Sequence, residues 1–96
     1  MKATYVALIN YTDQGDRSLK QSPQRALAFR QSIEAAGIKV LAQLWTTGVH
    51  DGVLILQGDS EEKVLRTLTQ LAALGNVRTQ SLRAFDAAEF AAIVGA

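Results

Sequence analysis

The sequence predicts an α+β domain built on a four-stranded antiparallel sheet, and three observations lead to this class. β-favouring runs and amphipathic stretches alternate in the order strand, helix, strand, strand, helix, strand, with a short helix at the end. The two middle strands are separated by a short glycine-containing turn, which predicts a hairpin. A helix connects the first strand to the second, and another connects the third strand to the fourth, which predicts two right-handed crossovers. Two crossovers joined by a hairpin are typical of the ferredoxin-like βαββαβ arrangement, with both helices on one face.

The first part of the chain is expected to form a strand, a loop and a helix. Residues 4–11 are apolar and β-favouring at most positions, which indicates a strand buried on both faces. Residues 12–21 are polar, and we expect a loop there. Ser22 suits the N-cap of a helix and Pro23 its first position, whereas Gly37 suits the left-handed residue that ends it.

Residues 38–46 are expected to form the second strand. Because side chains alternate along a strand, Leu41 and Trp45 are predicted on the face opposite to Val40 and Leu44. The remaining elements follow in order: a turn at 47–52, a strand at 53–57, a helix that starts at Ser60 and ends at Gly75, a strand at 77–85 and a final short helix.

The two later helices carry clear start signals. The run Asp59-Ser60-Glu61-Glu62 is expected to open its helix with a cap and with acidic residues in the first turn. Asp86 is expected to cap the final helix, with Glu89 at the position that completes a capping box.

Length and composition limit the function classes. Ninety-six residues make one domain, 1–96, with a single modest core. The net charge is +1 and the basic residues are spread along the chain, so no nucleic-acid partner is expected. The chain has no cysteine, which excludes disulfides and zinc–thiolate sites. With no signal-peptide pattern and no long apolar run, we expect a soluble cytoplasmic protein that does not enter a membrane.

The apolar character of the strands predicts a partner for the sheet. If both crossover helices cover one face of the sheet, the other face stays open. The first three strands nevertheless have apolar residues on that face, which indicates that something covers it. A second copy packed sheet against sheet would cover this face, in a homodimer or higher homo-oligomer. Alternatively, the C-terminal helix could fold back across it.

Three segments resemble the GYD-domain family of small, mostly bacterial proteins. They are Asn-Tyr-Thr-Asp at 10–13, Gly-Val-His-Asp at 48–51 and the stretch from Leu-Gly-Asn at 74–76 through 77–85. In the namesake motif, Gly48 and Asp51 match the glycine and the aspartate, while His50 stands where tyrosine is usual. The resemblance covers essentially the whole chain. It implies a ferredoxin-like fold of the dimeric α/β-barrel type, and therefore self-association.

His50 and Asp51 are the candidate catalytic residues. His50 is the only histidine, and imidazole is the side chain that most readily exchanges a proton near neutral pH. An adjacent carboxylate would orient it as a general base; alternatively, His50 is a solvated histidine in a turn. Asp51 and Gly52 also suit a turn, because both residue types tolerate positive φ.

The candidate ligand-binding residues are Asn10, Tyr11, Trp45 and Arg78. The first three are large or polar groups near the ends of apolar strands, as in a cleft with a few convergent hydrogen-bonding groups. Arg78 would anchor an anionic ligand; alternatively, it makes a structural ion pair or covers an edge of the sheet. No phosphate loop, catalytic triad or metal-ligand pattern is present, and no cofactor or metal is expected.

Two function hypotheses follow from these residues and from the resemblance. The first is an oligomeric small-ligand-binding or regulatory module. The alternative is a small cofactor-independent enzyme of the monooxygenase or isomerase type, as the resemblance to dimeric α/β-barrel proteins implies, with His50 as the base.

Overall fold

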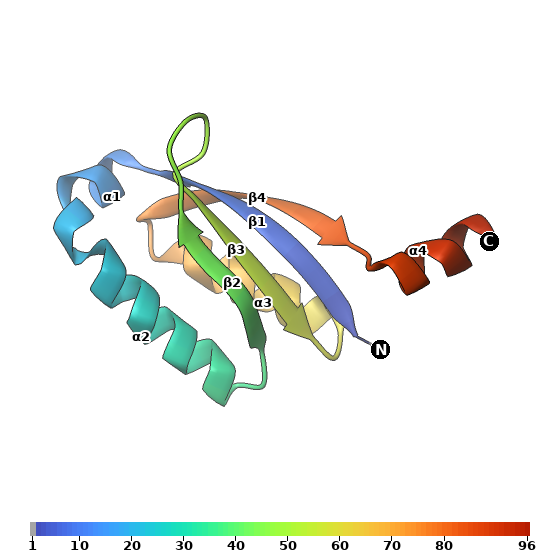
Figure 1. Ribbon diagram of the computed structural model, residues 1–96. Helices are drawn as coiled ribbons and strands as arrows, with labels where there is room; N and C mark the ends of the chain where they lie inside the picture. The colour runs from blue at the N-terminus through green and yellow to red at the C-terminus, as the bar shows by residue number, and fades with distance from the viewer. Residues whose placement is uncertain (1) are drawn as a thin grey trace.

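The computed structural model of the chain describes residues 2–96 and confirms the predicted α+β, ferredoxin-like order. The strands and helices are arranged in two layers, with a final helix outside them (Figure 1). The elements are β1 (Ala3–Tyr11), α1 (Asp13–Arg17), the 3-10 helix η1 (Leu19–Gln21), α2 (Ser22–Ala35), β2 (Lys39–Trp45), β3 (Gly52–Gly58), α3 (Glu61–Ala73), β4 (Val77–Ala84) and α4 (Ala87–Val94).

The four strands form one sheet in the order β2-β3-β1-β4, and every neighbouring pair is antiparallel. This order places β1 and β3 at the centre and leaves β2 and β4 as edges, as two crossovers joined by a hairpin require. Within the register, Val6 lies between Ile55 of β3 and Leu82 of β4. These three side chains therefore share one face of the sheet, which we call the open face because α2 and α3 cover the other.

The core lies between the sheet and the helices α2 and α3. Alternate residues of the central strands point into it and are buried, and they pack against Ile33 of α2 and Val64 and Leu68 of α3. The alternate residues of β1 on the open face are only half-buried. The strand predicted to be buried on both faces is therefore covered on one face by its own chain.

The predicted start signals of α3 and α4 are confirmed. The Ser60 side chain accepts a hydrogen bond from the Lys63 amide, 3.2 Å away. Asp86 and Glu89 form a complete capping box. At the other end of α3, Gly75 has a φ of +82°, the left-handed conformation that glycine adopts without strain.

Ser60→Ala is expected to lower the free energy of unfolding by about 1 kcal/mol, because it leaves an amide of the first turn of α3 without an acceptor. Urea denaturation measures the loss. Ser60→Asp keeps an oxygen acceptor and is expected to stay near wild type. Equal stability of the alanine variant and wild type would show that this cap contributes nothing.

The polar run 12–21 is not the loop we expected. It contains α1 and η1, and Thr12 caps α1 by accepting a hydrogen bond from the Gly15 amide. Ser22 is not the N-cap of α2 either. Ser22 is the first residue of the helix, and its side chain is buried. The N-cap is Gln21, whose side chain makes no capping hydrogen bond. The reason is that a preceding helical turn leads directly into α2, so the Ser22 hydroxyl is free to contact the sheet.

The predicted alternation of β2 is wrong beyond Val40, because the strand has a bulge at Leu41. Val40 pairs with Leu56 and Ala42 with Ile55, so the register shifts by one residue between them. As a result Trp45 lies on the helix side of the sheet, while Leu44 faces the open side. A bulge moves every later side chain of the strand to the opposite face. No residue type in this part of the sequence indicated that a bulge would occur.

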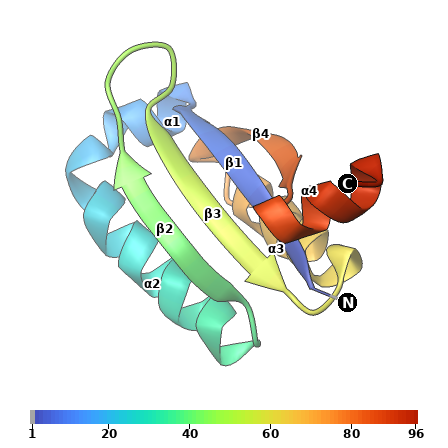
Figure 2. The ribbon, with the colours of Figure 1, turned by 45° about the vertical axis from the view of Figure 1, so that its right-hand side comes forward.

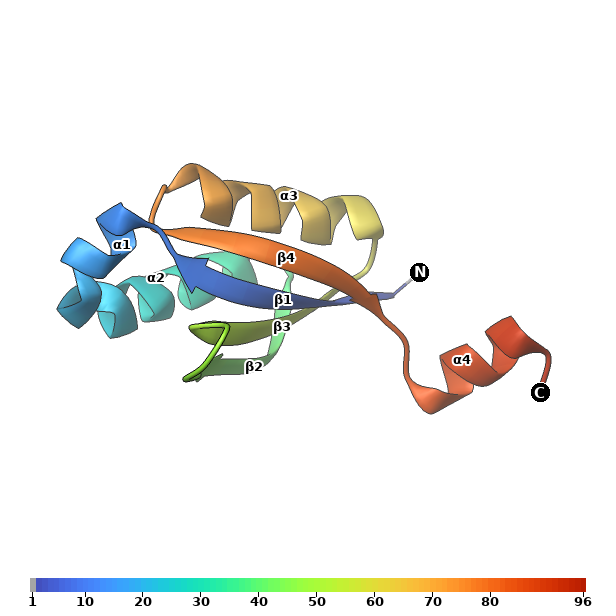
Figure 3. The ribbon, with the colours of Figure 1, turned by 90° about the horizontal axis from the view of Figure 1, so that it is seen from above.

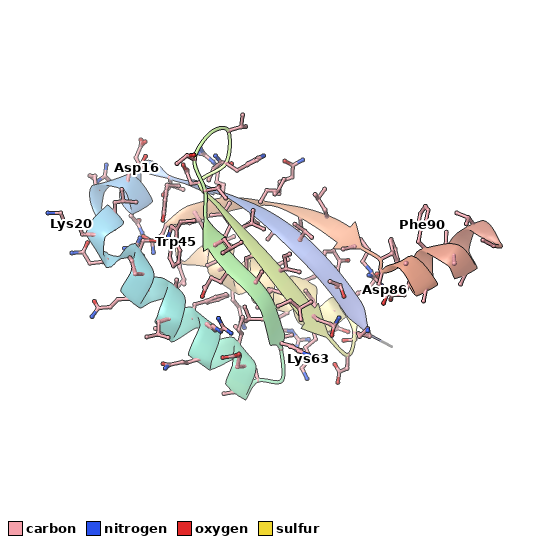
Figure 4. All side chains as sticks on the ribbon, in the orientation of Figure 1. Asp16, Lys20, Trp45, Lys63, Asp86 and Phe90 are labelled. Atoms are coloured by element: carbon pink, nitrogen blue, oxygen red, sulfur yellow. The ribbon has the colours of Figure 1, made fainter. Side chains whose placement is uncertain are left out.

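Helix α4 does not fold back over the sheet. It leaves the end of β4 and projects from the body, and α3 and α4 lie on opposite sides of the sheet (Figures 2 and 3). Its apolar residues are exposed, with Phe90 at 55% and Ile93 at 58% (Figure 4). Within residues 2–96 the open face therefore has no cover, and α4 has an apolar side without a partner.

Candidate functional site

Three segments that are distant in sequence converge at one end of the sheet. They are the end of β1 with α1, the loop 46–51 between β2 and β3, and the turn 74–76 between α3 and β4. Thr12 donates from its hydroxyl to the Gly75 carbonyl at 2.6 Å and from its amide to the Asn76 carbonyl at 3.1 Å. Gln14 adds hydrogen bonds to the Leu74 carbonyl and the Asn76 side chain. The sequence segments that resemble the GYD family therefore assemble one structural unit.

A cluster of three polar side chains lies beside this unit on the helix side. Tyr11 Oη and Ser22 Oγ are 2.5 Å apart, and Trp45 Nε1–H is shared between them at 3.0 and 3.1 Å. Trp45 lies at the end of β2 and faces the start of α2 (Figure 4). Because Ser22 is buried and Trp45 is half-exposed, the cluster extends from the interior to the surface.

The Asp51 side chain does not orient His50 as we expected; it stabilises the loop instead. Its Oδ2 accepts the Tyr11 amide at 2.8 Å, and its own amide donates to the Ile9 carbonyl at 2.7 Å. Neither Asp51 nor Gly52 has a positive φ, so these two residues do not adopt the left-handed turn conformation that we considered for them. The motif aspartate instead extends the pairing of β1 and β3 past the last ladder residue.

On the open face of the sheet, His50 contacts Asn10. The two side chains meet at 2.9 Å between Nδ1 and Oδ1, and Asn10 Nδ2 donates to the Val49 carbonyl at 2.8 Å. His50 is half-buried and does not line the cavities beside Trp45. Arg78 lies directly across from Asn10 in the register and is exposed, and among residues 2–96 its guanidinium makes no hydrogen bond or ion pair.

The sheet therefore divides the predicted site residues into two groups. Tyr11, Trp45 and Asp51 lie together at the helix side, whereas Asn10, His50 and Arg78 lie at the end of the open face. The sequence did not indicate Ser22 or Arg25 as site residues. Ser22 looked like a helix cap, and nothing in the pattern around Arg25 distinguished it from other helix-surface arginines.

A cavity of about 90 Å³ opens between α2 and α3 at this end of the sheet. Its walls are mainly aliphatic and aromatic, and its polar lining residues include Ser22, Arg25, Gln43, Asp51 and Asn76. The residues that line it include Ile9, Tyr11, Ser22, Arg25, Phe29 and Leu71. A second, more open depression shares Tyr11, Ser22, Trp45 and Asp51 with this cavity and is also lined by Asp16, Leu19 and Pro23.

Two further findings concern the described residues 2–96. No three His, Asp or Glu side chains lie together in an arrangement that could hold a metal ion. No helix in this range has the length and apolar character needed to cross a membrane.

The sheet order, the two covering helices and the motif unit define a small α+β protein of the ferredoxin-like class. The chain belongs to the GYD-domain family: the GYD domain matches residues 5–94. One relative, from Thermus thermophilus, is named glutamine synthetase and cystathionine beta-lyase binding protein. It is 31% identical over 90 residues, which are 93% of this chain and 95% of the relative. No solved structure matches significantly.

Proposed function

We propose that this protein is a homo-oligomeric binding module that associates through its open sheet face and binds other proteins in a regulatory role. The observation that carries the proposal is the apolar patch on that face. Seven side chains from all four strands form it, as the register shows: Val6, Leu8, Ala42, Leu44, Val53, Ile55 and Leu82. Leu44 is 60% exposed and Leu82 45%.

The arrangement of this patch supports an interface with a second copy. Contiguous apolar patches of several hundred Å² mark interaction sites on soluble proteins. Polar groups border it at both ends, with Asn10 and Arg78 at one and Gln57 and Lys39 at the other, as an apolar centre with a polar rim requires. A stable interface buries roughly 800 Å² on each partner. The exposed apolar side of α4, which projects on the same side of the sheet, would add to the area (Figure 3).

The relative supports the binding role. Its name states that it binds two enzymes, glutamine synthetase and cystathionine β-lyase, and it aligns with nearly the whole of this chain. We therefore propose that the partners of this protein are also metabolic enzymes. Purified glutamine synthetase and cystathionine β-lyase from the same organism, tested by biolayer interferometry, would give saturable binding. No binding to either enzyme at micromolar concentrations would contradict this partner assignment.

A cofactor-independent enzyme with His50 as the base receives less support from the geometry. His50 hydrogen-bonds to Asn10, and the Asp51 carboxylate that would orient it is bound to the Tyr11 amide. We therefore propose a binding role for this end of the sheet.

Ile55→Lys tests the oligomer. Ile55 lies at the centre of the patch, and a buried ammonium opposite an apolar face costs several kcal/mol. Light scattering after size-exclusion chromatography is expected to give a multiple of the chain mass for wild type and the monomer mass for the variant. Far-ultraviolet circular dichroism is expected to show that the variant is folded.

Leu65→Lys is the matched control, because Leu65 is an exposed leucine on α3 and not part of the patch. It is expected to keep the wild-type mass. A wild-type protein that stays monomeric at high micromolar concentration would contradict the proposal, as would an Ile55→Lys variant that remains oligomeric.

A further inference from the structure

The cavity between α2 and α3 has the form of a small binding site with one polar end. Its walls contain Ile9, Phe29, Leu54 and Leu71, and its volume is about 90 Å³. It lies on the helix side of the sheet, although Leu44 and Val53, which belong to the patch proposed for self-association, also line it. A variant that does not oligomerise is therefore needed to separate its occupancy from the oligomeric state.

The polar end offers a hydrogen-bond donor that the protein does not use. Tyr11, Ser22 and Trp45 together carry three donor protons: two hydroxyls and one indole N–H. The indole proton is shared by the two oxygens, and one hydroxyl donates to the other. The second hydroxyl proton has no acceptor among residues 2–96. The cluster can therefore donate to a ligand without breaking any of its own hydrogen bonds.

Arg25 adds a positive charge without a counter-ion. Its Nη1 donates to the backbone carbonyl and the hydroxyl of Ser18, at 2.9 and 3.0 Å, and both acceptors are neutral. Arg30, Arg66 and Arg83 each pair with a glutamate, but Arg25 has no carboxylate partner among the described residues. It is half-buried and lines the cavity, where a carboxylate would be bound by charge-assisted hydrogen bonds.

We propose that this cavity binds a small carboxylic acid with a short apolar chain, with the carboxylate on Arg25 and the Tyr11–Ser22 hydroxyl pair. The chain would occupy the apolar walls. One carboxylate of the protein, Asp51, also lines the cavity and would receive an ammonium group. An α-amino acid is therefore one source of the required carboxylate, and a simple aliphatic acid is the other.

Trp45 provides the readout, because it is the only tryptophan and its indole N–H belongs to the cluster. Isovalerate, its neutral analogue isovaleramide, and valine would be titrated into ¹⁵N-labelled protein while the indole cross-peak is followed. Isovalerate is expected to move this cross-peak and to bind about tenfold more tightly than the amide, because the amide cannot form an ion pair with Arg25.

Valine distinguishes the two sources of the carboxylate. An amino acid ligand is supported if valine binds more tightly than isovalerate and if Asp51→Asn removes this difference. Tighter binding of isovalerate supports an acid without an amino group. Both results support the carboxylate site.

Arg25→Gln is expected to remove the preference for acid over amide, whereas Arg30→Gln, on the same helix, is expected to keep it. Tyr11→Phe is expected to weaken isovalerate binding severalfold. Repeating the titration on Ile55→Lys separates ligand binding from oligomerisation. The proposal is overturned if no probe moves the indole cross-peak at tens of millimolar, if acid and amide bind equally to wild type, or if both arginine variants lose the preference alike.

Discussion

Leu56→Ala is expected to lower the free energy of unfolding by about 2–5 kcal/mol, the range for truncating a buried leucine. Leu56 lies on the central strand β3, between Tyr5 of β1 and Val40 of β2, and has no exposed surface. Removal of the end of the leucine side chain leaves a void. The surrounding residues cannot move far to fill it, because they belong to the adjacent strands β1 and β2. A domain of this size has a total stability of roughly 5–15 kcal/mol, so the variant would lose a large part of it.

Urea denaturation followed by circular dichroism measures this loss. Leu65→Ala is the control, because Leu65 is also a leucine but lies exposed on α3. It is expected to change stability by less than about 1 kcal/mol. A Leu56→Ala variant within that same margin of wild type would mean that the core is not centred on β3.

Gly15→Ala is expected to destabilise the protein by about 2 kcal/mol or more. In an ordinary helix this change would stabilise by roughly 0.5–1 kcal/mol. Here an added Cβ would lie 2.0 Å from the Asn76 carbonyl oxygen and 2.9 Å from the Tyr11 ring. The backbone of α1 has to move away from the 74–76 turn, which strains the hydrogen bonds that Thr12 donates to Gly75 and Asn76.

The displacement of Tyr11 provides a second readout, because its hydroxyl contacts the Trp45 indole. Intrinsic fluorescence of Trp45 is expected to change together with stability. Asp16→Ala, at the exposed neighbouring position of α1, serves as the control and is expected to change stability by only a few tenths of a kcal/mol. Stability at or above wild type for Gly15→Ala would show that α1 does not pack against the turn as described.

The order of the main strands and helices was predictable because each has a local cause. Asp86 caps the helix that it was expected to cap, Ser60 is the cap within the expected start of α3, and Gly75 adopts the left-handed conformation. These signals act within one or two turns of the chain. They are therefore readable without knowledge of distant contacts.

The site was less predictable, because its geometry depends on long-range register. The bulge at Leu41 determines that Trp45 faces Tyr11 rather than the open side. Ser22 resembled a cap, yet its hydroxyl contacts residues 11 and 23 positions away in the chain. A sequence pattern indicates which residues can form hydrogen bonds, but not which of them the sheet brings together.

By itself, the sequence determined the α+β class, the two crossovers, the start signals of the last two helices and the excess of apolar strand residues. Each of these follows from local backbone preference or from side-chain periodicity. Only the tertiary structure decided which face each residue of β2 occupies, that Asp51 pairs with Tyr11 instead of His50, and that Arg25 lines a cavity. The physical reason is that strand register and side-chain contacts are settled by packing between segments, where a shift of one residue exchanges the two faces of a strand.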